Sequence, residues 1–361
     1  MNHALTALTI FVLTFVASLI FVSRAIRIAE HVGIMDLPGP RRVHTKAVPR
    51  FGGVAVFLAF ALGLALTFSF DVDRLRDEVP RLIVLLGGAG LITGVLVYDD
   101  VLGIAPAPKL MWQIAAALLV VAPRLRGEDY GIVIDQFNAP FVGVVELPLV
   151  VALGFTIFWI VGMMNTLNFV DGLDGLASSV TIVGCAVLFI HTYFWPRGDP
   201  QFTISLLPLI LCAATLGFLW FNWHPARIIL GDAGANFLGF SLAVISIIGG
   251  AKIATALLAL GLPILDVAWV IAYRVAHGRS PAHADRGHLH HRLLDAGWSQ
   301  AQVVLFVAGV SAAFGIGALL LPDRTSKFVA LIAVAVVLLV TIAAIAVRDR
   351  QEAPARRSTE A

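Results

Sequence analysis

Charged residues are scarce in this chain. Asp, Glu, Lys and Arg make up 13% of its 361 residues, and hydrophobic residues make up 59%. A soluble globular domain carries roughly 25% charged residues, and the mean hydropathy here is +0.91. The composition therefore excludes a soluble fold, because such a fold could not bury this much apolar surface. The net charge of +2 gives no indication of a nucleic-acid partner, and we expect none.

Cysteine is nearly absent as well. Cys185 and Cys212 each lie inside a long apolar block. We therefore expect two buried thiols, and neither a disulfide framework nor a cysteine-based metal site.

The apolar residues gather in blocks of about 17–23 residues, the length that crosses the hydrocarbon core of a bilayer. Eleven such blocks run over residues 5–23, 52–70, 81–98, 108–123, 148–164, 176–195, 202–221, 234–250, 252–273, 301–321 and 328–347. The pattern predicts an all-α polytopic membrane protein with about eleven transmembrane helices. Residues 1–350 would form one membrane domain, and the polar tail 351–361 is expected to be disordered.

Basic residues predict the orientation of these helices. The first block is preceded by Met1-Asn2-His3, which lacks the positive charge of a signal peptide, and is followed by Arg24 and Arg27. We therefore expect an uncleaved helix with its N-terminus outside. From that start, 16 of the 25 Lys and Arg residues fall on the inner side, as the positive-inside rule requires. The C-terminus would then be cytoplasmic.

One outer segment, residues 124–147, contains two β-prone runs at 131–134 and 141–145. Asn138, Ala139 and Pro140 lie between them, so the segment predicts a small periplasmic β-hairpin.

The inner segments hold the polar residues, and the first cluster is an adjacent pair. Asp99 and Asp100 end the third apolar block. Adjacent carboxylates repel unless a cation lies beside them. They are either solvated charges at a helix end, or a general base with its partner near a metal-bound phosphate.

A second acidic segment carries Asn165, Asn168, Asp171 and Asp174 at intervals of three residues. On a helix this spacing would place the two carboxylates on one face. No basic residue in 165–176 neutralises them, so they are either solvated in a short loop or ligands of a cation. Oxygen ligands without nitrogen or sulfur suit Mg²⁺, with Mn²⁺ as the alternative ion.

A third carboxylate, Asp232, lies in the sequence Gly-Asp-Ala-Gly at the start of the eighth block. It predicts an N-cap. Capping uses one carboxylate oxygen and leaves the other free for a ligand, so the two roles are compatible.

A histidine segment follows the ninth block. His288, His290 and His291 lie between Arg286 and Arg292. The segment is a zinc site, a solvated interfacial loop, or a cationic loop that binds a diphosphate. Carboxylates that bind a cation and a basic loop that binds phosphate, on one membrane face, together indicate phosphoryl transfer.

These elements resemble a known family, the polyprenyl-phosphate N-acetylhexosamine-1-phosphate transferases of glycosyltransferase family 4. The resemblance runs from Asp36 to about Gly297. It rests on the first loop, the Asp-Asp pair, the Asn-x-x-Asn-x-x-Asp-Gly-x-Asp-Gly run, the Gly-Asp-x-Gly loop and the His-x-His-His loop, in family order.

The resemblance implies transfer of a sugar 1-phosphate from a UDP-N-acetylhexosamine to undecaprenyl phosphate, with Mg²⁺ as cofactor and UMP as second product. It implies catalytic roles for Asp99, Asp100, Asp171 and Asp174, and metal binding by Asp232, Asn168 and Asp171. The substrate-binding residues that it implies are Asn165, His288, His290, His291, Arg286, Arg292, Arg41 and His44. Asp99 and Asp100 would handle the lipid phosphate.

The branch of the family depends on Leu289, which interrupts the histidine run. The branch that uses UDP-MurNAc-pentapeptide usually has three consecutive histidines, so the sequence favours the GlcNAc-1-phosphate branch, which starts O-antigen, teichoic acid or related chains. The pentapeptide branch is kept as the alternative. The family often has Ser after Gly-Asp-x-Gly, where this chain has Ala235 and then Asn236.

The expected location is the bacterial inner membrane, with membrane lipid around the helices. The site is expected on the cytoplasmic face. A homodimer is one expected oligomeric state. A secondary transporter is the other reading, since intramembrane charges mark transport pathways near the midplane. Asp266 is the charged residue that lies nearest to the midplane in the sequence pattern, and we interpret it as a residue that supports the site.

Overall fold

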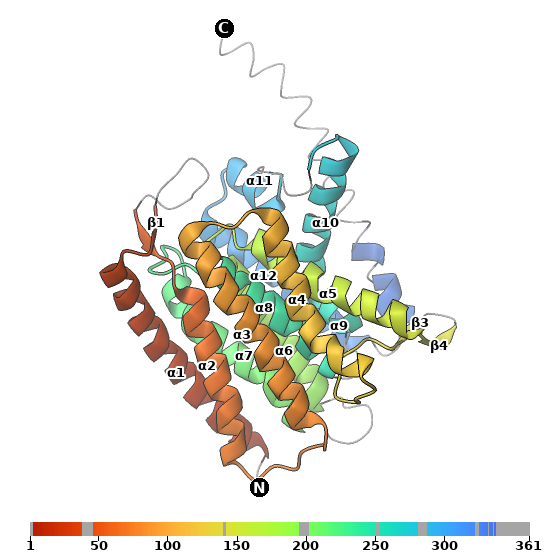
Figure 1. Cartoon of the computed structure of the whole chain (residues 1–361). Helices are drawn as coiled ribbons and strands as arrows, with labels where there is room; N and C mark the ends of the chain where they lie inside the picture. Colours follow the sequence, from red (N-terminus) through yellow and green to blue (C-terminus); the bar gives the residue numbers. More distant parts are fainter. Residues whose placement is uncertain are drawn as a thin grey trace.

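The computed structural model of the chain describes residues 3–37, 46–139, 142–194, 202–249, 253–280, 287–321, 325–330, 332–334 and 336. Helices dominate this part of the chain (Figure 1). They are α1 (His3–Val32), α2 (Gly52–Leu66), α3 (Glu78–Leu102), α4 (Pro106–Leu125), α5 (Leu149–Val170), α6 (Leu176–Phe194), α7 (Phe202–Asn222), α8 (Gly231–Ile248), α9 (Ile253–Ala259), α10 (Gly261–Ala276), α11 (Leu289–Asp295) and α12 (Gln300–Leu320). A 3₁₀ turn (Thr67–Ser69) follows α2, and the strands are β1 (Met35–Asp36), β2 (Val48–Pro49), β3 (Gln136–Ala139) and β4 (Gly143–Glu146).

Within the described residues, nine helices are long and apolar enough to cross a membrane. Helices α9 and α10 add a tenth span if they are counted as one, but they are bent by 78° relative to each other. The predicted polytopic helical class is therefore confirmed. The predicted number of about eleven is not reached, because the block at 252–273 is broken and the block at 328–347 lies mostly outside the described residues. The polar tail 351–361 also lies outside them.

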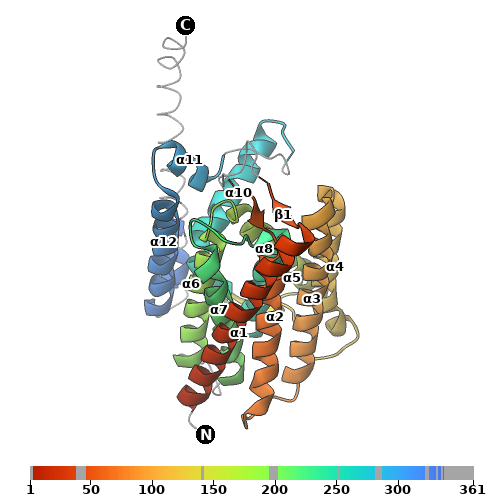
Figure 2. The same ribbon diagram turned by 90° about the vertical axis from the view of Figure 1, so that its left-hand side faces the viewer.

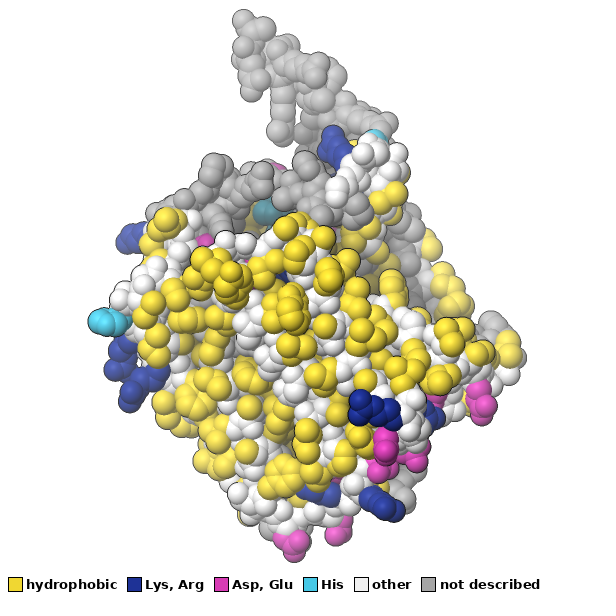
Figure 3. Space-filling model, viewed as in Figure 1, with side chains coloured by type: hydrophobic (Ala, Val, Ile, Leu, Met, Phe, Trp, Pro, Cys, Tyr) yellow, Lys and Arg dark blue, Asp and Glu magenta, His cyan; other side chains and the backbone are white. Residues whose placement is uncertain are grey.

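Hydrophobic side chains cover most of the face shown in Figure 3, where charged side chains gather at the left edge and in the lower part. This is the surface expected of helices that face lipid.

Helix α8 lies at the centre of the bundle (Figures 1 and 2). Every residue of α8 except Asp232 is buried, and the helix packs against α2, α3 and α5. Helix α1 packs outside it on α2 and α7, and α12 packs on α6 and α9. A helix that is apolar all round is expected in the interior, so α8 carries Asp232 into the middle of the molecule.

Glycines allow α2 to approach α8 closely near that end. A Cβ atom on Gly53 would lie 2.2 Å from the backbone nitrogen of Gly234. Small residues at such a crossing let the two backbones pack directly on each other. The first turns of α2 and α8 are therefore held together.

The chain before α2 is bound to the chain before α8 by backbone hydrogen bonds. Ile229 N–H donates to Pro49 O at 2.9 Å, and Gly53 N–H donates to Leu230 O at 2.9 Å. Strands β1 and β2 form an antiparallel pair beside this junction. The first loop therefore lies next to the start of α8.

The predicted hairpin is confirmed, since β3 and β4 pair antiparallel from Gln136 with Glu146 to Ala139 with Gly143. Its first strand begins later than the β-prone run at 131–134. Ile132 and Ile134 of that run are buried, and their N–H groups donate to Val120 O and Thr156 Oγ1. The run is used for packing against helices instead of for pairing.

Cys185 and Cys212 are free thiols; Cys185 is buried, as expected, whereas Cys212 is only half-buried.

Candidate active site

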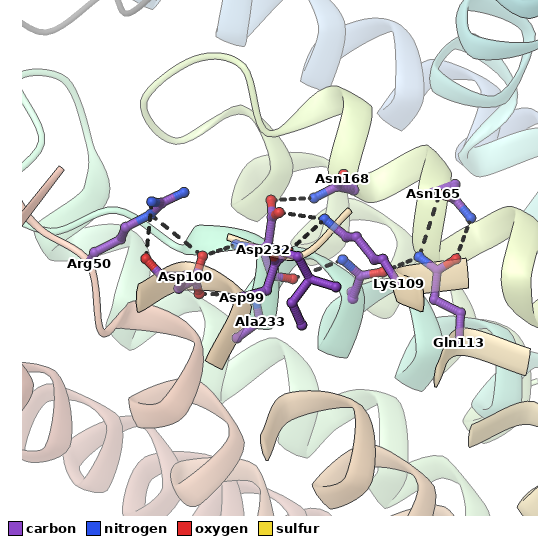
Figure 4. A network of polar contacts seen from close by, with 11 residues as sticks. Arg50, Asp99, Asp100, Lys109, Gln113, Asn165, Asn168, Asp232 and Ala233 are labelled. Carbon is purple, nitrogen blue, oxygen red and sulfur yellow. Dashed lines mark hydrogen bonds and ion pairs between the residues drawn. The ribbon is translucent and has the colours of Figure 1, made fainter. Parts of the chain in front are cut away.

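The polar segments meet at the end of the bundle opposite the N-terminus (Figure 1). Figure 4 shows their centre, where side chains from α3, α4, α5 and α8 and from the first loop form one continuous network. The expectation that these segments share one face is therefore confirmed.

Asp100 is bound to the start of α8. Its Oδ1 accepts the N–H of Asp232 at 2.9 Å, and its Oδ2 accepts the N–H of Ala233 at 3.2 Å. These are free amides of the first helical turn, where the helix dipole also favours a negative charge. Gly231 has φ +74°, and a Cβ there would lie 2.6 Å from Asp100 Oδ2. Asp100 thus caps α8, a role that the sequence suggested for Asp232.

Arg50 bridges Asp100 to the first loop. Its Nε lies 3.5 Å from Asp100 Oδ1, and its Nη1 lies 3.7 Å from Asp36 Oδ1. Nη1 also donates to the Asp100 carbonyl oxygen at 3.2 Å. The arginine side chain is 23% exposed. The Arg50 guanidinium is therefore a cation fixed beside the Asp-Asp pair.

Lys109 of α4 lies between two carboxylates. Its Nζ is 3.3 Å from Asp99 Oδ2 and makes a shorter ion pair with Asp232 Oδ2. The other oxygen of Asp232 accepts a hydrogen bond from Asn168 Nδ2 at 2.8 Å. Asp232, Asn168 and Asp99 are thus brought together around a lysine that was not predicted for the site.

A chain of amide side chains lies beneath Asp232, of which Gln113 and Asn236 are buried. Asn165 Nδ2 donates to Gln113 Oε1 at 2.9 Å, and Gln113 Nε2 donates to Asn236 Oδ1 at 2.6 Å. Asn236 in turn donates to the Asp232 carbonyl oxygen at 2.8 Å. Asn165 is therefore directed toward α4, and Asn236 is bound to the backbone of Asp232.

The acidic run after α5 is not helical throughout. Asn165 and Asn168 lie on α5, as expected, but the helix ends at Val170. Asp171 and Asp174 lie in the turn that follows, so the expectation that they share a helix face was wrong. The physical reason is the pair of glycines in this run, of which Gly175 has φ +77°.

Asp174 and Asp171 have different surroundings in this turn. Asp174 Oδ2 lies 2.7 Å from His224 Nδ1 and accepts the N–H of Ala226 at 3.1 Å. The Asp171 carboxylate has no hydrogen-bond or ion-pair partner in the part of the chain that the structure describes. Burial, together with the charges of Asp232 and then of Asp100, raises the pKa of Asp171 well above its usual range. Asp171 is therefore the carboxyl group with oxygens available for a ligand.

The histidine segment packs over this turn. A Cβ on Gly172 would lie 2.5 Å from His290 Nε2, so the glycine leaves room for the imidazole. His288 stacks on Phe169 with ring centroids 5.4 Å apart. Burial, with the neighbouring His291 and His288, lowers the pKa of His290 well below its usual range. The segment thus lies against the end of α5 with a neutral His290.

Other predicted residues are placed less completely. His291 and Arg292 are half-buried on α11. The Arg292 Nε donates to Gly287 O at 3.0 Å. Arg41, His44 and Arg286 lie outside the described residues, so their predicted roles stay predictions.

The donor set fits Mg²⁺ in its chemistry, because Asp171, Asp232 and Asn168 offer only oxygen to a cation. In the described ranges, no group of three His, Cys, Asp or Glu side chains is already close enough to enclose an ion. The Lys109 ammonium lies between Asp99 and Asp232, where a cation is required. The carboxyl groups gathered here outnumber the two fixed cations, Arg50 and Lys109; they are Asp36, Asp99, Asp100, Asp171, Asp174 and Asp232.

Sequence reasoning missed three residues of the network. In the sequence, Lys109 contributes only to the count of basic residues on the inner side, although it is the one basic residue at the start of its apolar block. Gln113 lies four residues later and therefore on the same helix face. Arg50 stands two residues before the Gly-Gly pair of α2. A polar residue inside an apolar block is the signal that could have identified Lys109 and Gln113.

Fold and site together define a polytopic helical membrane protein with an anion-rich, lysine-bridged site at one end of the bundle. The family model for glycosyl transferase family 4 matches residues 82–250. A Bacillus subtilis protein named probable undecaprenyl-phosphate N-acetylglucosaminyl 1-phosphate transferase is 31% identical over 327 residues, covering 87% of this chain and 85% of that protein.

Two further relatives agree. The decaprenyl-phosphate N-acetylglucosaminephosphotransferase of Mycolicibacterium smegmatis is 30% identical, covering 84% of this chain and 78% of its own. The undecaprenyl-phosphate alpha-N-acetylglucosaminyl 1-phosphate transferase of Escherichia coli is 26% identical, covering 86% and 82%. The chain belongs to glycosyl transferase family 4.

Proposed function

We propose that this protein transfers N-acetylglucosamine 1-phosphate, or a related N-acetylhexosamine 1-phosphate, from a UDP-sugar to a polyprenyl phosphate such as undecaprenyl phosphate. An oxygen of the lipid phosphate forms a bond to the sugar-bearing phosphorus of the donor. The bond from that phosphorus to the bridging oxygen breaks, and UMP leaves with the bridging oxygen. The products are a lipid diphosphate sugar and UMP.

The observation that carries this proposal is the lysine-bridged carboxylate cluster around Asp232 at the end of the bundle. Asp99 and Asp100 lie in the last turn of α3, and Asp232 lies in the first turn of α8. A site at this level is reached by a soluble nucleotide from the water and by a lipid phosphate from the bilayer surface. The names of the three relatives support the same substrates.

The cations of the site would hold the phosphates. Arg50 and Lys109 are fixed beside the carboxylates by the ion pairs described above. Phosphoryl transfer depends mostly on positioning and on neutralising charge. Asp171, Asp232 and Asn168 would hold Mg²⁺, or Mn²⁺, and the ion would supply further positive charge to the transferred phosphate.

The acceptor needs little activation by the protein. A phosphate monoester has its second pKa near about 6, so it is largely dianionic at pH 7. The attacking oxygen is then already a nucleophile, which favours direct attack over a route through an aspartyl phosphate. In a direct route Asp100 serves to hold Arg50 and the start of α8, and Asp171 serves the cation.

The remaining predicted residues would bind the donor. His288, His290, His291 and Arg292 lie beside the end of α5, where they can reach a diphosphate. We assign Arg41, His44 and Arg286 to the same task from the resemblance alone. Asn165 would act through Gln113 and Asn236 on the position of Asp232.

The site would face the cytoplasm of a bacterial inner membrane. The distribution of Lys and Arg supports this orientation, and nucleotide sugars are cytoplasmic. A homodimer is the oligomeric state that we propose to test alongside activity, by size-exclusion chromatography with light scattering.

The test uses the full chain in detergent with undecaprenyl phosphate, Mg²⁺ and labelled UDP-GlcNAc. We expect equal amounts of UMP and lipid-linked sugar. Parallel reactions with UDP-MurNAc-pentapeptide and other UDP-N-acetylhexosamines identify the donor. If no UDP-sugar yields a lipid-linked product, the proposed function is wrong.

Two variants connect the activity to the site. Asp171→Asn should lower turnover at least about 100-fold, because an interaction of about 2.7 kcal/mol or more is lost in the transition state. The matched control is Asp135→Asn, which removes a carboxylate near the hairpin. The Asp135 side chain is 56% exposed. Normal activity in Asp171→Asn would reject the role of Asp171.

A further inference from the structure

A carboxylate on helix α10 reaches the histidine segment. Asp266 Oδ2 lies 2.9 Å from His288 Nδ1, and Asp266 Oδ1 accepts the N–H of Leu289 at 2.8 Å. Asp266 is 8% exposed and His288 is 5% exposed. Each carboxylate oxygen is engaged by a different donor, so the carboxylate orientation is fixed and the Nδ1 proton of the imidazole points toward α10.

The other nitrogen of this imidazole is left without a partner. His288 Nε2 is buried and has no hydrogen-bond partner among the residues that the structure describes, and the same holds for Nη1 of Arg292. The hydrogen bond from Nδ1 to Asp266 and the stacking on Phe169 hold the ring in this orientation. A buried polar atom without a partner is costly, and a bound ligand would remove that cost.

We propose that Asp266 is a positioning residue for the transfer reaction, which holds His288 with Nε2 directed at an anionic oxygen of the donor diphosphate. This inference rests on the proposed function. With Nδ1–H bonded to Asp266, a neutral imidazole offers only a lone pair at Nε2. An anionic oxygen therefore binds only the imidazolium form, whose charge Asp266 balances.

The charged and titratable groups around His288 in the described part of the chain are few. Asp266 faces it from α10, and the His290 ring lies parallel to it at 5.7 Å on α11. Arg274 of α10 also approaches Phe169, with its guanidinium carbon 5.8 Å from the Phe169 ring. Asp266 is thus the one carboxylate among these groups that can stabilise the imidazolium.

The variant Asp266→Asn changes this arrangement in a defined way. Leu289 N–H can only donate, so the amide oxygen of the new side chain must stay on it. The amide NH₂ then faces His288 Nδ1, which must become an acceptor. The neutral imidazole consequently carries its proton at Nε2 and remains a donor to phosphate without any charge.

The experiment measures the KM of UDP-GlcNAc and of undecaprenyl phosphate from about pH 6 to about pH 8, the range in which an imidazole changes charge. In the unaltered protein, the KM of UDP-GlcNAc should depend on pH, because only a ring that carries both protons can donate from Nε2 to the donor while Nδ1 donates to Asp266. In Asp266→Asn, that KM should be about tenfold higher at the acid end, because a charge-assisted hydrogen bond becomes a neutral one. It should also be nearly independent of pH, and the KM of the lipid should change less than about twofold.

Three variants separate positioning from folding. Asp266→Glu should restore the pH dependence. His288→Asn can keep the bond to Asp266 but has no atom at Nε2, so its KM for UDP-GlcNAc should also be raised. Asp135→Asn should match the unaltered protein.

Equal changes in both KM values at every pH would show a merely structural role and overturn the inference, as would an unchanged KM in Asp266→Asn. If the unaltered protein makes no lipid-linked product, the proposed function fails and UMP becomes the probe. Stabilisation against unfolding by UMP should then be weakened by Asp266→Asn. Equal stabilisation, or none in the unaltered protein, would overturn the inference.

Discussion

Replacing Lys109 by methionine is expected to make the protein depend on a divalent cation for its stability. Methionine keeps a similar length and removes the charge. The ammonium lies 3.3 Å from Asp99 Oδ2 and closer to Asp232. At an effective dielectric constant of about 20, one such contact corresponds to about 5 kcal/mol of Coulomb energy.

The loss in the free energy of unfolding should be smaller than this Coulomb energy. Breaking a buried pair by removing one partner costs about 3–5 kcal/mol, because the other charge is left uncompensated. Lys109 is 16% exposed, so water reduces the cost, and we expect about 3 kcal/mol. Mg²⁺ at about 100 times its dissociation constant would return about 2.7 kcal/mol. Lys109→Met should therefore be unstable with EDTA and close to normal with Mg²⁺.

The assay follows thermal unfolding with a thiol-reactive dye, because Cys185 is fully buried and becomes reactive when the chain unfolds. Lys46→Met removes an exposed lysine and serves as the control. The decisive quantity is the gain in stability on adding Mg²⁺ in each protein. An equal gain in Lys109→Met and in the unaltered protein would refute the reasoning.

Three further outcomes follow from single contacts. Arg50→Lys should lower turnover about tenfold or more, because lysine cannot hold Asp100 with two nitrogens; normal turnover would exclude that role. Gly172→Ala places a Cβ 2.5 Å from His290 Nε2 and should raise the donor KM, whereas Gly162→Ala points into open space and should not. Because the pKa of folded His290 lies below its unfolded value, stability should be complete above about pH 6.5 and fall as the pH drops below it. His290→Gln should reduce that fall, and an unchanged stability profile would contradict the assignment.

Apolar block length predicted the membrane helices well, because the hydrocarbon thickness sets that length. It failed at 252–273, where one continuous block contains the bend between α9 and α10. Gly261 and Pro263 stand at this bend, but hydropathy alone does not register them. The length of the first apolar block, 5–23, also underestimates α1, which continues to Val32. Polar residues outside the hydrocarbon can continue a helix.

The acidic members of the site were predictable because carboxylates are rare in this chain, so each one is conspicuous. Their partners were not. Which carboxylate is bound to a helix start, as Asp100 is, and which is free, as Asp171 is, depends on contacts between residues more than 100 positions apart. Spacing along the sequence carries no information about such contacts.

The level of the carboxylates argues against transport and for interfacial chemistry. A transporter places its charged site near the bilayer midplane, at interrupted helices. Here Asp99 lies in the last turn of α3, Asp232 lies in the first turn of α8, and Asp171 follows the last residue of α5. Directly below them lie the neutral amides of Gln113, Asn165 and Asn236, of which Gln113 and Asn165 are paired to each other. The phosphate group of a lipid phosphate lies at the membrane surface, at this same level. The site can therefore reach the acceptor phosphate without a charged group having to enter the hydrocarbon.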